Sequence, residues 1–462
     1  MSEPELICPT IDLFLYDLRE GFGDNDQQIQ NSRYYFWRKI YHDLNNLDPS
    51  IRNQKLNQKL RVEGAAEENA EARYVELLGA KRVRKFEAGL DGHYYPIQFE
   101  DTYGLLVDCS GHKRDRPYLP KPIGELEDIN KQIQQHIQDD ALESTASSMN
   151  ELGRTWLIWG QLVNNQQDNQ AIAEKCYTKL VNKPDWDKDL NGKGKLLGGE
   201  IYELWRHSGN DNSKYAHVLI CLFPADDSME SIRGAISKIY FDLMRLFCFR
   251  HKIIWAYHQT RQLRKSIKAD FAVIKQLTEQ ASNQVANANI SALQIDLTKA
   301  LEILSRYSPN LTALYYQGRT IEINLANYQK RLKKISDQSP QTDLGFQTKF
   351  LEIIAPQYQG EIKADQERFE RGLTLLQNLL EANRGRIELY QADRDRRFEQ
   401  MIAIAGFGLA TSQIAAAIII AQNPPKSEVP VVMTPAFWKS LGIGIGVALI
   451  AWFILRQLFR RR

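Results

Sequence analysis

The chain has 462 residues, too many for a single hydrophobic core, so two or three domains are expected. Its charged fraction of 25% and net charge of +2 are ordinary for a folded protein and give no indication of a nucleic-acid or acidic partner. Its five cysteines are odd in number and lack C-x-x-C spacing, which argues against a disulfide framework or zinc site and is typical of a reducing compartment.

The first part of the chain, residues 1–260, has the pattern of a mixed α/β cytoplasmic domain of the α+β class. Short apolar or alternating runs bounded by Gly, Asn, Asp and Pro predict strands at 11–18, 103–109, 155–163, 200–205 and 217–223. Residues 45–80 and 125–152 are polar and helical in pattern, whereas 164–170 and 182–199 are predicted loops. A sheet with flanking helices is the expected architecture.

Residues 261–400 have the pattern of a helical stalk or coiled coil. A long helix with an apolar stripe is predicted to begin after Ser228, which suits an N-cap. Further helices are predicted at 261–280 and 290–305. Another apolar stripe runs from Leu314 to Ile335 and ends at the turn-rich sequence SDQSPQTDLG. Antiparallel helices are therefore expected before the last part of the chain.

The last part of this stalk carries a heptad seam. Its members alternate at steps of four and three residues: Phe369, Leu373, Leu376, Leu380, Asn383, Ile387, Tyr390, Arg394, Arg397 and Met401. Gly372 and Gly385 each cost only about 1 kcal/mol in a helix, so one helix is expected to run from the stalk into the next segment. The polar members Asn383, Arg394 and Arg397 favour a wide, water-filled bundle over a dry dimeric coil; an irregular solvated helix face is the alternative.

Two apolar segments near the end of the sequence predict a membrane hairpin. Residues 401–421 form an uncharged run of about 20 residues, the length that crosses a bilayer, and we place the first span at 401–422. The run at 440–455 is shorter, but Lys439 and Arg456 at its ends can extend to the interfaces, which places the second span at 437–458. A buried hairpin of a soluble domain is the alternative.

Basic residues predict the orientation of this hairpin. They gather before the first span and after the second: Arg394, Arg396, Arg397, Arg456, Arg460, Arg461 and Arg462. Because basic flanks stay inside, we expect an inner-membrane protein with both termini cytoplasmic, a short external loop at 423–436 and a basic tail at 459–462. The first ten residues lack the basic region of a signal peptide, which fits this expectation.

Polar residues interrupt the first span. Thr411, Ser412 and Gln413 would lie near the middle of the bilayer, where polar groups must bond to another helix or line water. Small residues at four-residue spacing, such as Gly406 and Ala410, favour close helix packing. Pore lining and helix–helix bonding both remain open.

Motifs for catalysis are missing from the sequence, and we expect no enzyme: no P-loop, G-x-G-x-x-G, H-E-x-x-H or G-x-S-x-G occurs. Cys109 and His112 resemble a nucleophile and base, but a packed cysteine is commoner. His251 and His258 could share a helix face, where packing is favoured over metal binding. The basic run contains Lys81, Arg82, Arg84 and Lys85. A solvated face is its default interpretation, and a binding site for an anion or nucleotide is the alternative.

This order of a mixed α/β domain, a long helix and two terminal spans resembles the CorA-type metal ion transporter superfamily, most closely over residues 311–462. The resemblance implies a homopentamer whose first span lines the pore, with Mg²⁺ or another divalent cation as transported ion and no required cofactor. The family signature Gly-Met-Asn is represented here by Ala421, Gln422 and Asn423, so only the Asn is retained. A ring of Asn423 amides, with Gln422 beside it, would contact a hydrated cation through its water shell; alternatively, both residues simply end a helix before Pro424.

The resemblance implies a homo-oligomeric ion channel or transporter gated by its cytoplasmic domain, with membrane lipid and further copies of the chain as partners and no direct contact with DNA or RNA. Divergent CorA-like proteins also include membrane effectors of prokaryotic antiviral systems such as type III CRISPR, gated by a nucleotide messenger, and this is the alternative. A non-conducting coiled-coil tether is the third possibility.

Overall fold

The computed structural model describes residues 3–21, 23–41, 61–62, 73–86, 91–111, 118–137, 151–206, 217–283, 290–390 and Trp438. The chain divides into two units, both discontinuous in sequence. Unit 1 consists of Met1–Trp255 and Asn324–Ala355, and unit 2 of Ala256–Ile323 and Pro356–Arg462.

Unit 1 is built on one large sheet. Along its main path the described strands run in the order β2-β3-β5-β6-β1-β8-β11-β10-β9, with β4 paired to β5 and β7 to β1. Neighbouring strands are antiparallel except β8 and β11, which are parallel. The strands are β1 Glu5–Leu18, β2 Arg61–Val62, β3 Arg73–Glu76, β4 Arg84–Lys85, β5 Asp91–Phe99, β6 Thr102–Ser110, β7 Pro120–Pro122, β8 Glu151–Leu162, β9 Leu190–Leu196, β10 Gly199–Trp205 and β11 His217–Phe223.

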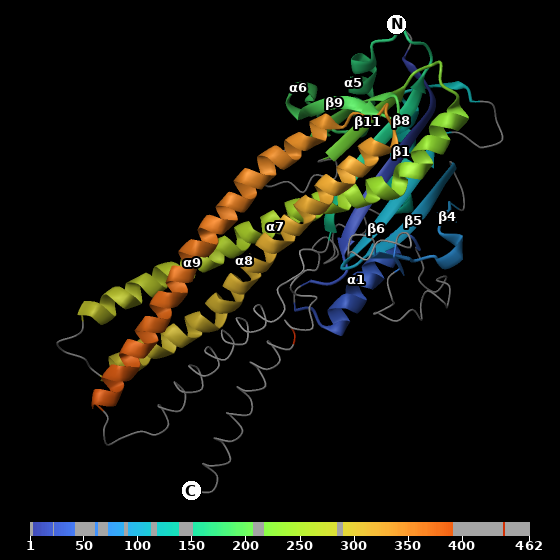
Figure 1. Cartoon of the computed structure of the whole chain (residues 1–462). Helices are drawn as coiled ribbons and strands as arrows, with labels where there is room; N and C mark the ends of the chain where they lie inside the picture. The colour runs from blue at the N-terminus through green and yellow to red at the C-terminus, as the bar shows by residue number, and fades with distance from the viewer. Residues whose placement is uncertain are drawn as a thin grey trace. The chain divides into compact units, whose positions relative to one another are not determined.

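Helices cover both faces of this sheet, so the central strand β1 is buried on both sides (Figure 1). Successive side chains of a strand point to opposite faces. Leu13 belongs to a core that also contains residues of four helices: α1 Asp26–Arg38, α3 Glu125–His136, α5 Asn169–Leu180 and α6 Trp186–Asp189. Phe14 faces the other way and packs against Phe247 of α7, with ring centroids 5.0 Å apart.

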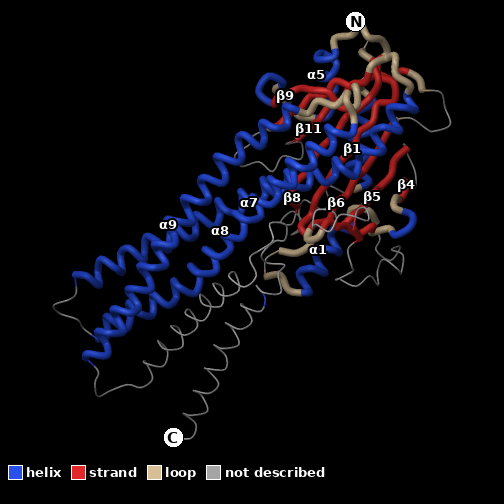
Figure 2. Tube along the Cα trace, viewed as in Figure 1, coloured by secondary structure: helices blue, strands red, loops and turns tan. Residues whose placement is uncertain are grey.

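Three long helices, α7 Met229–Asn283, α8 Ile290–Gln338 and α9 Thr348–Tyr390, each contribute to both units. Figure 2 draws helices in blue and strands in red. The Ser228 hydroxyl accepts a hydrogen bond from the backbone N–H of Ser231 at 3.3 Å, which confirms Ser228 as the N-cap of α7. Within unit 2 the three helices share one apolar core, to which Ile274, Tyr307 and Leu376 each contribute from a different helix.

The outer edge of β9 is covered by the chain that returns between α8 and α9. Lys195 and Asp343 exchange backbone hydrogen bonds of 2.8 and 2.7 Å, and the short helix η5 Gly345–Gln347 follows. A Cβ atom on Gly194 would lie 2.2 Å from the carbonyl oxygen of Asp343, so only glycine allows this approach. The returning segment therefore protects a sheet edge that would otherwise be open.

The structure confirms the mixed α/β domain and the long helices. All five predicted strands are present, as parts of β1, β6, β8, β10 and β11. The predicted helix at 45–80 is wrong where the chain is described, because β2 and β3 pair there. The predicted loop at 182–199 is also wrong, because α6 and β9 lie within it, and the predicted helix at 125–152 ends at His136 before β8 begins at Glu151.

The predicted stalk helices are confirmed, although they are longer than expected. The predicted helix at 261–280 is the second half of α7, and the predicted helix at 290–305 joins the later apolar stripe in α8 across Pro309. Among the residues that the structure describes, no helix is both long and apolar enough to cross a membrane. Apart from Trp438, the predicted spans at 401–422 and 437–458, the loop at 423–436 and the tail at 459–462 lie outside the described residues.

Candidate functional site

Beneath the first half of α7, a chain of hydrogen bonds joins three strands to the helix. His251 Nε2 lies 2.8 Å from the Thr155 hydroxyl, which lies 2.8 Å from Nδ1 of His217. His217 Nε2 lies 2.9 Å from a carboxylate oxygen of Glu203. All four side chains are buried. We call this set, together with Arg250, the α7 anchor cluster.

The charges in the α7 anchor cluster determine which group donates the proton in each of its hydrogen bonds. Burial alone would raise the pKa of Glu203, but Arg250 and the hydrogen bond from His217 hold it below its usual value. Burial lowers the pKa of His217 to about 4, with Arg250 contributing, and lowers that of His251 as well. Both rings are therefore neutral near pH 7. His217 donates to Glu203, Thr155 donates to His217, and His251 donates to Thr155.

Arg250 is held by one carboxylate and two aromatic rings. Its guanidinium lies 3.4 Å from Glu203 and between the rings of Trp205 and Phe350, at 4.3 and 4.2 Å from their centroids. It is fully buried. Cation–π contact in a dry environment contributes roughly 2 kcal/mol, so the rings replace part of the lost hydration. This arrangement joins α7 to β10 and to the start of α9 within unit 1.

A second polar cluster, the carboxyl pair, lies further toward the start of α7. Asp12 and Asp108 face each other directly in the register of β1 and β6. The Tyr240 hydroxyl lies 2.9 Å from Asp12 and 3.1 Å from Asp108. Trp159 donates to Asp12 at 3.0 Å, and His93 lies 3.3 Å from Asp108.

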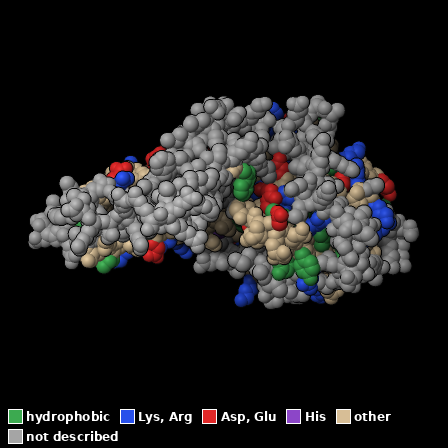
Figure 3. Space-filling view, turned by 90° about the horizontal axis from the view of Figure 1, so that it is seen from below, with side chains coloured by type: hydrophobic (Ala, Val, Ile, Leu, Met, Phe, Trp, Pro, Cys, Tyr) green, Lys and Arg blue, Asp and Glu red, His purple; other side chains and the backbone are tan. Residues whose placement is uncertain are grey.

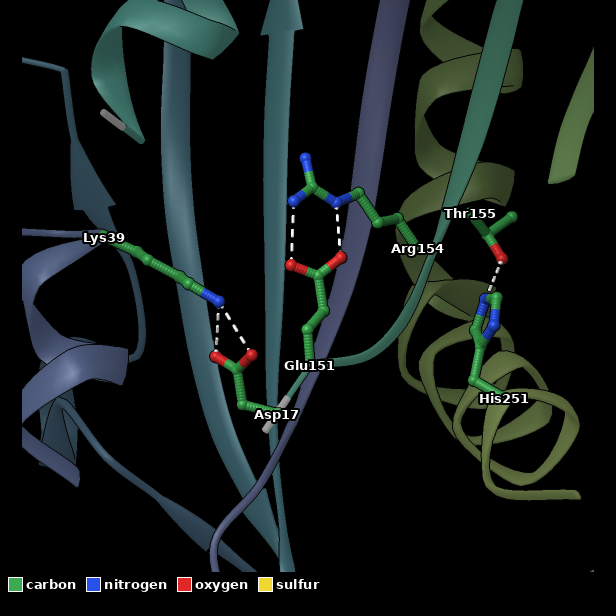
Figure 4. A network of polar contacts seen from close by, with 6 residues as sticks. All are labelled: Asp17, Lys39, Glu151, Arg154, Thr155 and His251. Carbon is green, nitrogen blue, oxygen red and sulfur yellow. Dashed lines mark hydrogen bonds and ion pairs between the residues drawn. The ribbon is translucent and has the colours of Figure 1, made fainter. Parts of the chain in front are cut away.

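Two ion pairs lie side by side at the end of β1 (Figure 4). Lys39, the C-cap residue of α1, donates to both carboxylate oxygens of Asp17 at 2.7 Å, and Arg154 binds Glu151 through two bonds of 2.5 and 2.7 Å. Asp17 and Glu151 are register partners on β1 and β8. Burial raises the pKa of Asp17, while Lys39 opposes this effect. The alternation of charge keeps two neighbouring carboxylates compatible.

Together these clusters anchor α7 and α1 to the sheet. The Glu203–His217–Thr155 order is the order of a nucleophile triad, but the Thr155 side chain is fully buried and its hydroxyl is bonded to His251 of α7. The arrangement can transmit a change of charge or position between the strands and α7. Among the described side chains, no group of three or more His, Cys, Asp or Glu is arranged to hold a metal.

The predicted basic patch is only partly an open surface. Arg84 lies 3.9 Å from the ring centroid of Tyr41 and donates to the carbonyl of Ile40. Arg82 is exposed but lies 3.6 Å from Glu76. Lys81 and Lys85 are exposed. On the face shown in Figure 3, acidic side chains stand among the basic ones.

Of the residues noted as a possible nucleophile pair or metal pair, the structure describes Cys109, His251 and His258. Cys109 is buried in the core on the side of α1 and α3, whereas His112 lies outside the described residues. His251 belongs to the α7 anchor cluster, while His258, two turns later, is exposed. His251 and His258 therefore differ in surroundings and do not form a shared site.

The predicted seam packs within the chain as far as it is described. Leu376 and Asn383 are fully buried in unit 2, and Leu380 packs against the same core. Ile387 lies within α9. Arg394 and Arg397, and the predicted pore residues Thr411, Ser412, Gln413, Gln422 and Asn423, lie outside the described residues.

Sequence reasoning missed the carboxyl pair and most of the α7 anchor cluster. Asp12, Asp108 and Glu203 each interrupt an apolar strand on a face that is otherwise buried. A lone acid at an inward position of a strand is the signal that could have marked them, since buried charges require partners. No protein family, no curated protein and no solved structure was found to match this chain.

Proposed function

We propose that this chain is a homo-oligomeric membrane protein that conducts ions, with unit 1 acting as its cytoplasmic gating domain. The observation that carries this proposal is the uncharged run at 401–421, which follows shortly after the end of the described part of α9. A run of this length favours a membrane span. The second apolar segment at 440–455 and the basic flanks support a hairpin with both ends inside.

The order of elements supports the same proposal. A mixed α/β unit, long helices and then paired apolar segments is the order implied by the resemblance to CorA-type transporters. In that arrangement α9 would be the helix that leads into the first span. We infer a pentamer in which Thr411, Ser412 and Gln413 line the conduit and Gln422 and Asn423 form its external mouth.

The α7 anchor cluster supports a gating role for unit 1. Its buried charged groups couple the strands to α7, and the same helix continues into unit 2, where it packs with α9. A change at the sheet can therefore reach the helix that precedes the first span. Mg²⁺ or another divalent cation is the proposed transported ion, because amide oxygens suit a cation that keeps its water shell.

A flux assay tests this proposal. The purified full-length protein would be reconstituted in vesicles and exposed in turn to Mg²⁺, other divalent cations, K⁺ and Na⁺, with and without cyclic oligonucleotides. We expect divalent cation flux, altered by Asn423→Ala and unchanged by the loop control Ser427→Ala. Unchanged flux in the Asn423→Ala variant, with intact oligomers, would remove Asn423 from the conduit.

Other outcomes separate the alternatives. Flux that requires a nucleotide would support the antiviral effector instead. Absence of flux from intact, correctly inserted oligomers would support a non-conducting tether. A protein that stays in the aqueous fraction without detergent would overturn the membrane proposal itself.

A further inference from the structure

The carboxyl pair has too few hydrogen-bond donors for two ionised acids. Trp159 and Tyr240 both donate to the same oxygen of Asp12, and the single Tyr240 proton is shared with Asp108. The other oxygen of Asp12 is buried and meets no donor among the described residues. A buried carboxylate oxygen without a donor costs several kcal/mol, so two ionised carboxylates would need one more proton than these donors supply.

The pair of Asp12 and Asp108 is where this additional proton would bind. Asp12 and Asp108 are register partners on β1 and β6, and the Tyr240 hydroxyl lies within hydrogen-bond distance of both carboxyl groups. Two carboxylates this close cannot both stay charged in a buried site, because like charges raise the free energy of the doubly ionised state. A proton on Asp12 removes one of the two charges, so the oxygen that meets no donor no longer belongs to a buried carboxylate.

The surroundings favour one proton, not two. Burial and the neighbouring Asp108 raise the pKa of Asp12 well above its ordinary value. Burial would also raise that of Asp108, but the hydrogen bonds and charge supplied by His93 and Asp12 lower it. The other charged or titratable groups that interact with the pair from the side of α7 are Arg233 and Tyr240, whereas the neighbouring Cys109 lies in the core on the other face of the sheet.

We propose that Asp12 and Asp108 form a binding site for one proton, and that this proton fastens the first half of α7 to the sheet through Tyr240. Release of the proton leaves two adjacent charges under α7, and the helix loosens from β1 and β6. The proton concentration around unit 1 is then an input to this unit. This inference does not require that the chain conduct ions.

The sign of the effect follows from linkage. The pKa of Asp12 is higher in the folded chain than the ordinary value of 3.8 expected when it is unfolded. Its contribution to stability is therefore complete below that value and is lost as pH rises through the folded pKa. Alkaline conditions should loosen α7, and mildly acidic conditions should tighten it.

Hydrogen exchange of the full-length protein in detergent tests the inference. We expect protection of the α7 amides between residues 236 and 247, corrected for intrinsic exchange, to fall by about tenfold or more between about pH 5 and pH 9. Asp12→Asn keeps the shape of the protonated carboxyl and can still donate a hydrogen bond, but it cannot titrate. Protection of the α7 amides in this variant should therefore not vary with pH. The exposed control Asp187→Asn should follow the wild-type protein.

A wild-type protection that is constant over this range, or an Asp12→Asn variant that keeps the wild-type pH dependence, would overturn the inference. A direct measurement does not depend on any variant folding. Infrared spectra of protein labelled with ¹³C-aspartate should show the carbonyl band of a protonated carboxyl near neutral pH that disappears at alkaline pH. Absence of that band would show that both acids are ionised and the site holds no proton.

Discussion

Gly153 leaves no room for a side chain, because a Cβ atom there would lie 2.4 Å from Nδ1 of His251. Its φ of +148° also lies in a region that other residues rarely adopt. Gly153→Ala should therefore push His251 from Thr155 and lower the free energy of unfolding by about 2 to 4 kcal/mol. Chemical denaturation measures this change. Gly234→Ala on α7, where a Cβ atom meets nothing within 4 Å, should be neutral or stabilising by up to about 1 kcal/mol.

The α7 anchor cluster should make stability depend on pH. Burial lowers the pKa of His217 to about 4, below its unfolded value of 6.5, so the unfolded chain binds the extra proton first as pH falls. The contribution of His217 is therefore present above 6.5 and is lost as pH falls through about 4. His217→Gln should reduce the pH dependence of the denaturation midpoint across this window. The control His258→Gln, at an exposed histidine, should reduce it less. Equal slopes in both variants would contradict this assignment.

The Lys39–Asp17 pair should be costly to break on one side. Both side chains are buried, so Lys39→Met leaves an unpaired carboxylate and should lower the free energy of unfolding by about 3 to 5 kcal/mol. Adding Asp17→Asn removes the stranded charge and should restore part of the loss. The matched control is the exposed pair of Lys188 and Asp185, where Lys188→Met should change stability by less than about 1 kcal/mol.

Gly372 should be required in unit 2, although helix propensity alone predicts that a glycine at this position slightly lowers stability. A Cβ atom there would lie 2.3 Å from the Tyr307 hydroxyl and 2.5 Å from the ring of Phe271. That hydroxyl donates to the carbonyl of Phe369 at 2.7 Å, so its position is fixed. Gly372→Ala should lower the free energy of unfolding by about 2 kcal/mol, and thermal denaturation should show a lower melting temperature. On the same helix, Gly360→Ala has open space and should raise it.

Asn383 should be a destabilising residue. It is fully buried, and neither atom of its amide has a hydrogen-bond partner among the described residues. Asn383→Leu should therefore raise the free energy of unfolding by about 1 to 2 kcal/mol, as measured by denaturant titration. A loss of stability would instead show that the amide has a partner, and Asn383→Asp should then be worse than Asn383→Leu.

The central strands could be predicted because their apolar runs differ from the surrounding turns. β9 could not, because its sequence LNGKGKL has the glycines and lysines of a loop. Gly192 and Gly194 are instead required by Phe346, which comes from a distant part of the chain. β5 was missed for a similar reason, since Pro96 and His93 weaken the strand pattern.

The polar clusters could not be predicted, because strand register and helix docking create them. Asp12 and Asp108 are far apart in sequence and meet only through the pairing of β1 with β6. Glu203, His217 and His251 come from three separate elements. Local sequence patterns contain no information on contacts between distant residues, whereas they do contain the apolar stripe that predicted α7 and α8.

The returning segment between α8 and α9 also determines when unit 1 can be completed during synthesis. Phe346 and Phe350, which cover β9 and Trp205, leave the ribosome only after the whole of α7 and α8 has been made. Until then the nascent sheet keeps an open edge and Arg250 lacks one of its two rings. A chain stopped near residue 260 would keep that edge permanently and could pair with another copy through it.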